Sequence, residues 1–432
     1  MSNVKERGYI IAEIKLMEPL CVSSGINEYA DNDIIRDFDG RPFIPASSIA
    51  GAIRNYVNND KVFGDRVNGS NSNQTQRMSS VFISDFYFDD NVKTKIRNNV
   101  ALDDEKIAKD TALFNMEVIE PDFSTNKQDG VMIFEYVQYD NNTADIVGAL
   151  KQALCGIDAG DIRFGSKKNR GLGRMKILNV YSKKFTMPKD NDNWLDFNVH
   201  NYYKNNKTKE DLLDLSEVKV SSSFTTITVP LKLAGGISIR EYAAKKNEPD
   251  YTHITSGGWP VVPGSSFAGA IRHQCKRNLE LLGVEKEKIK DMLNEMFGYE
   301  DCSKQSEVVI CESKLFDAKG SNKKPVCMKM TRNKIDRFDA STEKGALYTE
   351  KSVFNATTEL VIKLRKSNEI DWKIGLLIIA IKDIQEGYLA IGGQTAIGRG
   401  IFSENGSYSV NGVTIKQEEE NKFFKELAKK IS

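Results

Sequence analysis

The 432-residue chain has no apolar run that approaches the ~18–20 residues a membrane helix needs. We therefore expect no membrane span. Residues 1–7 also lack the apolar segment of an export signal, which predicts a cytoplasmic protein. The six cysteines show no Cys-x-x-Cys spacing, so we expect reduced thiols and no structural zinc site.

Histidine is scarce as well, and the chain has almost no net charge. The first 199 residues contain no histidine. Lys+Arg number 61 and Asp+Glu number 60, so any nucleic-acid surface must be a local patch rather than a wholly basic domain. Aromatic residues make up 9% and do not interleave with basic runs, which argues against a broad base-stacking platform. No Gly-x-x-x-x-Gly-Lys-Ser/Thr motif occurs, so P-loop nucleotide hydrolysis is not expected.

What the chain does contain is a long internal repeat. Arg-Pro-Phe-Ile-Pro-Ala-Ser-Ser-Ile-Ala-Gly-Ala-Ile-Arg at 41–54 returns as Trp-Pro-Val-Val-Pro-Gly-Ser-Ser-Phe-Ala-Gly-Ala-Ile-Arg at 259–272. Further matches follow in the same order, and they predict a tandem duplication of a domain of roughly 200 residues. We expect a first domain at 1–186, a linker or insertion at 187–218 and a second domain at 219–432.

Each copy shows the same order of predicted elements. Alternating strand-like runs stand at 9–16 and 224–233. A helix follows each Pro-x-Ser-Ser, with the first serine expected to cap it. Helical patterns at 144–158 and 371–386 precede a glycine-rich segment. Strand, helix, strands, helix and strand in each half predict an α+β fold of two tandem ferredoxin-like or RRM-like domains.

The glycine-rich segments at 164–174 and 392–400 are candidate contacts to a nucleic-acid backbone. Glycines let the chain approach a phosphate closely, and free N–H groups can hold an anion. The alternative is a tight turn between a helix and an edge strand. The first segment carries basic residues that favour phosphate binding: Lys167, Lys168, Arg170, Arg174 and Lys176. The serine-rich helix starts offer further N–H and hydroxyl donors, with simple capping and packing as the alternative.

Two aspartates are the candidate catalytic residues. Aligning the copies places Asp31 over Asp250, each in a loop, where an aspartate is usually a turn or cap residue. Histidine cannot supply the same chemistry in both copies, and His253 aligns with Ile34, so His253 and His273 are expected to be surface or packing residues. A carboxylate that orients a 2′-hydroxyl or holds a hydrated Mg²⁺ is then the route to RNA scission.

The order of these motifs resembles the RAMP (repeat-associated mysterious protein) subunits that form the helical backbone of type III CRISPR effector complexes. The matching elements are Asp-x5-Asp followed by Gly-Arg-Pro-x-Ile-Pro-x-Ser-Ser, an Arg-x4-Leu-Asp stretch followed by Leu-Phe-x-x-Glu, and a Gly-x4-Arg-Gly-x-Gly-Arg loop. The resemblance covers nearly the whole chain twice. Two fused copies resemble the fused backbone proteins of type III-D-like systems.

The resemblance implies modified RRM-like domains with β-hairpin thumb insertions, here at 97–120 and 332–355, that flip nucleotides of the RNA. It implies that Asp31 and Asp250 cleave target RNA and bind the metal, Mg²⁺ or Mn²⁺. It also implies these RNA contacts: Ser47, Ser48, Arg54, Lys167, Lys168, Arg170, Arg174, Ser265, Ser266, Arg272, Arg332 and Arg399.

The predicted function is that of a guide-RNA-binding backbone subunit of a type III CRISPR effector complex. It would be a metal-dependent endoribonuclease that cuts complementary target RNA at two sites, one per domain. Expected partners are the guide (CRISPR) RNA, the target RNA, the large signature subunit and the small subunits. Three alternatives stay open: a non-catalytic guide-binding subunit, a RAMP endoribonuclease that processes precursor guide RNA, and an RRM-type regulator. The histidine-free first half argues against the processing enzyme, because such enzymes usually rely on histidine.

Overall fold

The computed structural model describes residues 3–25, 30–65, 77–90, 92–103, 108–218, 222–242, 249–299, 304–320 and 323–432. The chain forms two compact units, which we describe separately. Unit 1 comprises Met1–Ile96, Phe114–Lys168 and Leu172–Ser222, and unit 2 comprises Arg97–Leu113, Asn169–Gly171 and Ser223–Ser432. Two short segments of the first repeat, 97–113 and 169–171, thus belong to unit 2. Residues 187–218, expected as a linker or insertion, lie in unit 1.

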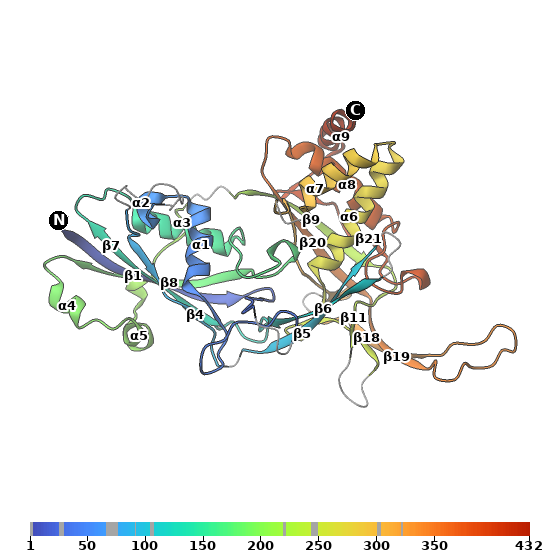
Figure 1. Cartoon of the computed structure of the whole chain (residues 1–432), viewed down its shortest axis with the longest axis horizontal. Helices are drawn as coiled ribbons and strands as arrows, with labels where there is room; N and C mark the ends of the chain where they lie inside the picture. Colours follow the sequence, from blue (N-terminus) through green and yellow to red (C-terminus); the bar gives the residue numbers. More distant parts are fainter. Residues whose placement is uncertain are drawn as a thin grey trace. The chain divides into compact units, whose positions relative to one another are not determined.

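Unit 1 is built on a four-stranded antiparallel sheet of order β3-β7-β1-β8. Helix α1 follows β1, and helix α3 follows β7; Figure 1 shows both helices on one face of the sheet. This order of strands and helices is the ferredoxin-like arrangement. The bounds are Val4–Leu16 for β1, Val81–Ile83 for β3, Gly130–Tyr139 for β7, Met175–Thr186 for β8, Ala46–Val57 for α1 and Ile146–Asp158 for α3.

The core of unit 1 fills the space between the helices and the sheet. Ile10 and Phe134 of the sheet are fully buried with Ile53 of α1 and Leu154 of α3. Asp145 caps the start of helix α3, and its carboxylate accepts a hydrogen bond from the N–H of Gly148 at 2.8 Å. The predicted strand at 9–16 and helix at 144–158 are therefore confirmed.

The opposite face of this sheet is covered by the chain itself. Short helices α4 (Asn191–Leu195) and α5 (Val199–Asn201) and the helical turn Tyr202–Asn206 pack beneath β1 and β8 (Figure 1). Ile11 and Ile133 are buried against Tyr202. The ring of Phe197 lies 5.0 Å from that of Tyr9 and 5.3 Å from that of Tyr202. Because these residues occupy the face, it is closed to stacking bases.

Unit 2 contains the same arrangement with a longer helical layer. Its sheet runs β15-β20-β9, and β21 and β22 pair with the other edge of β9. Helices α6 and α8 take the places of α1 and α3. The bounds are Phe224–Leu233 for β9, Val308–Ile310 for β15, Ala356–Arg365 for β20, Phe402–Glu404 for β21, Ser409–Val410 for β22, Gly264–Leu281 for α6, Lys286–Phe297 for α7, Ile370–Gln385 for α8 and Gln417–Ile431 for α9.

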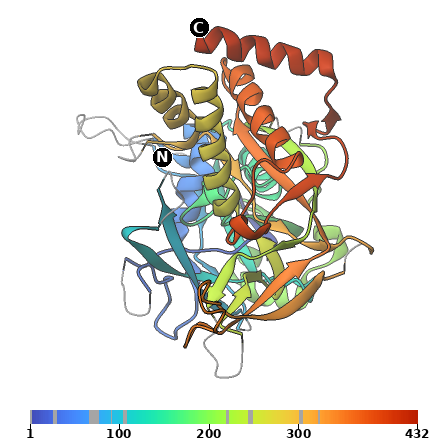
Figure 2. The same ribbon diagram turned by 90° about the vertical axis from the view of Figure 1, so that its right-hand side faces the viewer.

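Helix α9 adds an outer layer on α8 (Figure 2). A glycine makes this close approach possible, because a Cβ added to Gly375 of α8 would lie 2.7 Å from the carbonyl oxygen of Phe423. The strand predicted at 224–233 matches β9, and the helix predicted at 371–386 matches α8. The predicted fold, two tandem ferredoxin-like or RRM-like domains, is confirmed.

Each repeat also inserts a hairpin between its second and third core strands. The first consists of β5 (Thr94–Leu102) and β6 (Ala108–Ile119), and the second of β18 (Val326–Arg332) and β19 (Tyr348–Phe354). Both hairpins begin before the predicted thumb ranges, and residues 104–107 lie outside the described part of the chain.

The remaining short elements connect these layers. They are β2 (Phe43–Ile44), α2 (Asp60–Phe63), β4 (Phe86–Tyr87), β10 (Gly236–Ile237), β11 (Arg240–Tyr242), β12 (Tyr251–His253), β13 (Thr255–Ser256), β14 (Trp259–Val262), β16 (Ser313–Lys314), β17 (Phe316–Asp317), β23 (Val413–Thr414) and the helical turns Lys168–Arg170, Lys209–Asp211 and Thr395–Ile397. Within the ranges that the structure describes, no helix is both long enough and apolar enough to cross a membrane.

Candidate nucleic-acid interface

The two candidate aspartates occupy equivalent places in the two repeats. The residue after Asp31 forms a parallel bridge with Met116 on the returning strand of the first hairpin. The residue after Asp250 pairs in parallel with Glu350 on the returning strand of the second hairpin. Both aspartate side chains are exposed. The geometry therefore agrees with the alignment of Asp31 over Asp250.

Both carboxylates accept hydrogen bonds from the hairpins beside them. Oδ2 of Asp31 accepts from the backbone N–H of Asn115 at 2.7 Å. Oδ2 of Asp250 accepts from the N–H of Thr349 at 2.7 Å and from its hydroxyl at 3.2 Å. The bonds from Thr349 hold the pKa of Asp250 below its ordinary value. A carboxylate that stays ionised suits a cation or a hydroxyl donor better than it suits proton abstraction.

The serines of the two helix starts lie in the first turns, not at the caps. Pro45 precedes α1, and Pro263 precedes α6. Proline has no side-chain acceptor, so neither of these N-cap residues makes a side-chain capping hydrogen bond. The predicted serine caps are therefore wrong: each helix begins directly after the proline, whose fixed φ and extended ψ end the preceding segment. This leaves the predicted RNA-contact serines unused as caps; Ser47 and Ser48 are exposed, and Ser265 and Ser266 are half-buried.

The arginines that follow these serines lie in the last turn of α1 (Arg54) and near the middle of α6 (Arg272). Arg54 donates to the carbonyl oxygen of Gly64 at 2.7 Å and pairs with Asp60 at 3.3 Å. Arg272 donates to Oδ1 of Asn294 at 3.5 Å. Each arginine thus contacts protein groups of the segment that comes next in its own repeat.

The two glycine-rich loops share one backbone conformation. Lys167 and Gln394 both have positive φ, at 51° and 60°, and a helical turn follows each. A Cβ added to Gly173 or Gly400 would lie only 1.9 or 1.8 Å from a carbonyl oxygen of the same loop, so glycine is required there. The tight turn that sequence reasoning kept as an alternative is therefore present in both loops.

The predicted basic residues of the first loop differ in exposure. Lys168 and Arg170 are exposed, whereas Arg174 is half-buried. Lys167 lies with its ammonium 3.7 Å from the centroid of the Phe114 ring. Lys168 and Arg170 are thus open to an RNA backbone, as is the exposed Lys176 just after the loop.

Two further predicted contacts of the second repeat, Arg332 and Arg399, are paired with a buried carboxylate. Arg332 lies 3.1 Å from Glu350, whose side chain is 1% exposed. Arg399 lies 3.9 Å from the same carboxylate, and its guanidinium stacks 4.6 Å from the centroid of Phe354. The side chain of Arg399 is 12% exposed, so its charge faces the interior of unit 2.

Sequence reasoning missed a basic strip beside Asp250. Lys329 and Lys351 stand directly opposite each other on β18 and β19, and both are exposed. Like charges facing each other destabilise a sheet unless an anion lies between them. Lys329 also lowers the pKa of Asp250, after the larger contribution of the Thr349 hydrogen bonds. The alternation along β19 was the available signal, since Thr349 and Lys351 face one side and Glu350 the other.

Histidine has a structural role at this site. His253 is buried, its Nε2 donates to the carbonyl oxygen of Val261 at 2.8 Å, and its Nδ1 accepts from the N–H of Ile239 at 3.2 Å. Burial lowers its pKa to about 4, so it is neutral at pH 7. The expectation that His253 is a packing residue is confirmed.

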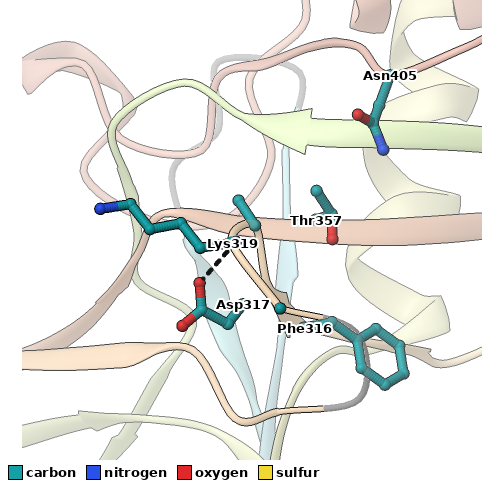
Figure 3. Close-up of a pocket in the computed structure, with 7 residues that line it drawn as sticks. Phe316, Asp317, Lys319, Thr357 and Asn405 are labelled. Atoms are coloured by element: carbon teal, nitrogen blue, oxygen red, sulfur yellow. Dashed lines mark hydrogen bonds between the residues drawn. The ribbon is translucent and has the colours of Figure 1, made fainter.

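A groove in unit 2 is lined by none of the candidate residues, and the described residues include no cluster of metal ligands. Among the described residues, no three His, Cys, Asp or Glu side chains are grouped to hold a metal ion. An open groove of about 440 Å³ lies in unit 2, where Asp317 accepts a hydrogen bond from the N–H of Lys319 (Figure 3). Its lining residues are Phe316, Asp317, Ala318, Lys319, Gly320, Thr357 and Asn405, none of them a predicted site residue.

Tandem RRM-like domains, each with a hairpin, a glycine-rich loop and a loop aspartate, define the class of the chain. The pattern of the RAMP superfamily matches residues 13–176 and 244–403. The chain therefore belongs to the RAMP superfamily, and the resemblance seen in its motifs is confirmed. The two matched ranges also fall in the two repeats.

The similarity of the chain to individual known proteins is low. No curated protein matches the chain. A solved structure to which it is similar is titled "Cryo-EM structure of the Type III-B Cmr-beta bound to cognate target RNA". The sequence identity is 15% and the TM-score is 0.33; the match covers 44% of this chain and 61% of that chain.

Proposed function

We propose that this chain is a guide-RNA-binding backbone subunit of a type III CRISPR effector complex, and that it cuts complementary target RNA once in each repeat. Asp31 and Asp250 would be the catalytic residues. The observation that carries the proposal is their equivalence: two exposed aspartates, each hydrogen-bonded to the returning strand of its hairpin, in a duplicated RAMP fold. An aspartate that served only to stabilise the turn of one repeat would not be expected at the equivalent place in the other.

The charged surface supports a role in holding RNA. Lys168 and Arg170 lie exposed on the first glycine loop, and Lys329 and Lys351 lie exposed beside Asp250. These residues are local cations on a chain of net charge +1, which fits phosphate contacts in confined grooves rather than general affinity for polyanions. The donors on the serine helices would add neutral contacts.

The carboxylates suit a metal shared with the RNA. Mg²⁺ is commonly held by one or two carboxylates together with substrate phosphates and water. Asp31 and Asp250 fit that scheme because each side chain is exposed and one of its carboxylate oxygens accepts a hydrogen bond from the hairpin. The metal would activate the attacking hydroxyl or stabilise charge on the phosphate. The role of the chain is to orient the carboxylate and to hold the strand beside it.

The test is cleavage by the assembled complex loaded with guide RNA and a labelled complementary RNA in Mg²⁺. Asp31→Ala is expected to abolish one cut and Asp250→Ala the other, each by about 10²–10³-fold. Guide content should stay unchanged in both variants. The exposed Asp90 provides a matched control, since Asp90→Ala should leave both cuts intact.

Two results would overturn the proposal. If both single variants still yielded the full product set, the aspartates would be turn residues. If the wild-type complex left target RNA whole in Mg²⁺ and Mn²⁺, the chain would be a non-catalytic guide-binding subunit. Chelation by EDTA should stop both cuts together.

A further inference from the structure

The hairpin strands beside the two candidate aspartates can be aligned residue by residue. Asn115 and Thr349 are equivalent, because each donates its backbone N–H to the aspartate of its own repeat. Two residues further along each strand, the first repeat has Glu117 and the second repeat has Lys351. Side chains two residues apart on a strand face the same side of a sheet, so Glu117 and Lys351 occupy equivalent places. An acidic residue of one repeat is thus replaced by a basic residue of the other.

In the first repeat, the charge at this place is cancelled. Arg36 donates to both carboxylate oxygens of Glu117, at 2.9 Å and 2.5 Å. Such a two-point contact between an arginine and a carboxylate is strong and fixes both side chains. The side chain of Glu117 is 10% exposed. The pair as a whole is neutral, so it offers a phosphate no excess of positive charge.

The cation that the first glycine-rich loop brings to this hairpin lies on its other face. The ammonium of Lys167 is 3.7 Å from the centroid of the Phe114 ring. Phe114 and Glu117 are three residues apart on β6, so their side chains face opposite sides of the strand. Lys167 is therefore held on the face that Glu117 does not occupy.

In the second repeat, the equivalent place carries two like charges. Lys351 of β19 stands directly opposite Lys329 of β18, and both side chains are exposed. Thr349 and Thr331 form the neighbouring pair on the same face. The hydroxyl of Thr349 donates to Asp250 at 3.2 Å. The two ammonium groups thus lie on the face of the hairpin that holds Asp250.

A phosphate of an RNA backbone fits between these two lysines. Side chains directly opposite each other in an antiparallel pair have Cβ atoms about 4.5–5.5 Å apart, so one anion can contact both ammonium groups. Lysine is a common ligand of phosphate, and an anion there removes the repulsion between the like charges. The lysine pair lies two residues from Thr349, which is about 6.6 Å along the strand. A phosphate held there would lie beside Asp250 and leave its carboxylate open to the scissile phosphate.

We propose that Lys329 and Lys351 form a phosphate site that positions the target RNA for the cut at Asp250. In the first repeat, the neutral pair of Glu117 and Arg36 takes the place of this site. The two cuts therefore differ in their dependence on salt, because added ions screen exposed lysines. This inference rests on the proposed function, since it concerns the target RNA and its two cuts.

The first experiment measures the two cuts separately, with guide-loaded complex in excess over end-labelled complementary RNA. Lys329→Ala combined with Lys351→Ala should slow the cut at Asp250 by about 10–100-fold and leave the cut at Asp31 unchanged. Replacing both lysines with arginine should preserve the rate, because the charges remain. In the unaltered complex, added salt should slow the cut at Asp250 more than the other cut, and the alanine variant should lose this difference. Lys366→Ala, which removes an exposed lysine of unit 2 outside the hairpin, is the matched control.

The second experiment measures the phosphate contact without cleavage. In a complex that carries Asp31→Ala and Asp250→Ala, the target RNA backbone beside the second site should be protected from hydroxyl radicals. Replacing both lysines with alanine should remove that protection. The thermal midpoint of the lysine variant should not fall, because the change removes a pair of facing like charges.

Three outcomes would overturn the inference. They are an unchanged cut at Asp250 in the alanine variant, equal slowing of both cuts, and a footprint that does not depend on the lysines. The footprint also separates this inference from the proposed nuclease activity. A complex that leaves RNA whole but shows lysine-dependent protection would refute only the nuclease activity.

Discussion

The interiors beside the two candidate aspartates are built from opposite chemistry. In the first repeat, an apolar cluster lies there, formed by Cys21, Met116, Val118 and Leu172. In the second repeat, the equivalent positions hold Ser238, Glu350, Ser352 and Arg399. The serines and Glu350 are at most 1% exposed. The same backbone is thus supported by hydrophobic burial in one repeat and by a buried charged network in the other.

The charged network holds the second glycine loop to its hairpin. Gln394 of the loop donates to Glu350 at 2.5 Å, and Arg332 and Arg399 lie on the same carboxylate. In the first repeat, Lys167 takes the place of Gln394 and points to an aromatic ring. The loop conformation therefore depends on its glycines. The side chains packed beneath the loop can be apolar in one repeat and charged in the other, provided that they differ as a set.

The largest effect is expected from moving one charge between the repeats. Leu172→Arg places an unpaired cation in an apolar cluster and should destabilise unit 1 by about 4–5 kcal/mol. Arg399→Leu removes one of two cations on Glu350 and should cost about 1–3 kcal/mol in unit 2. Hydrogen exchange measured peptide by peptide gives the loss of stability in each unit separately. Equal losses would show that the two interiors do not differ as described.

The next effect is a dependence on pH confined to unit 2. The unfolded chain binds a proton at His253 below about pH 6.5, whereas in the folded chain burial lowers the pKa to about 4. Folded stability should therefore fall as the pH drops through this window, by about 3 kcal/mol in all. His253→Ile, which copies Ile34 of the first repeat, should remove this contribution, which lies above the range in which the carboxylates titrate. Denaturant midpoints from pH 7 to pH 4 give the measurement; the same slope in the variant would contradict the assignment.

The smallest effect tests how the glycine loops hold RNA. Lys168→Ala should remove one phosphate contact and flatten the slope of log affinity against log salt by about 0.7 for single-stranded guide RNA. Thr395 occupies the same position in the second loop, so Thr395→Ala should leave the slope unchanged. Fluorescence anisotropy over a series of salt concentrations measures both. An identical slope for wild type and Lys168→Ala would exclude this residue from the backbone contacts.

Much of the architecture could be predicted from the repeat. Strand β9 and helix α8 fall where the alternation of apolar residues and the helical period place them, because burial against one core forces those periods. The alignment also paired Asp31 with Asp250 correctly in space. Helix starts were less predictable, since proline ended the preceding segment and the following serine was left inside the first turn.

The charged residues were the hardest to interpret. Arg332 stands in a basic stretch and Arg399 in a glycine-rich one, and both settings suggest RNA contact, yet both arginines pair with Glu350. That carboxylate belongs to a strand of the hairpin, so no local pattern links it to the loop. The facing pair of Lys329 and Lys351 likewise depends on hairpin register, which is set across the turn.

The order of residues along the chain is enough to predict a duplicated α+β protein with matched aspartates, glycine loops and hairpins, because repeats and periodicity are properties of that order. The folded structure was needed to show which cations are exposed and which carboxylates are buried with arginine. Those outcomes depend on residues far apart in sequence, such as Arg97 and Glu312, which only the folded chain brings together in an interior where their attraction is weakly screened.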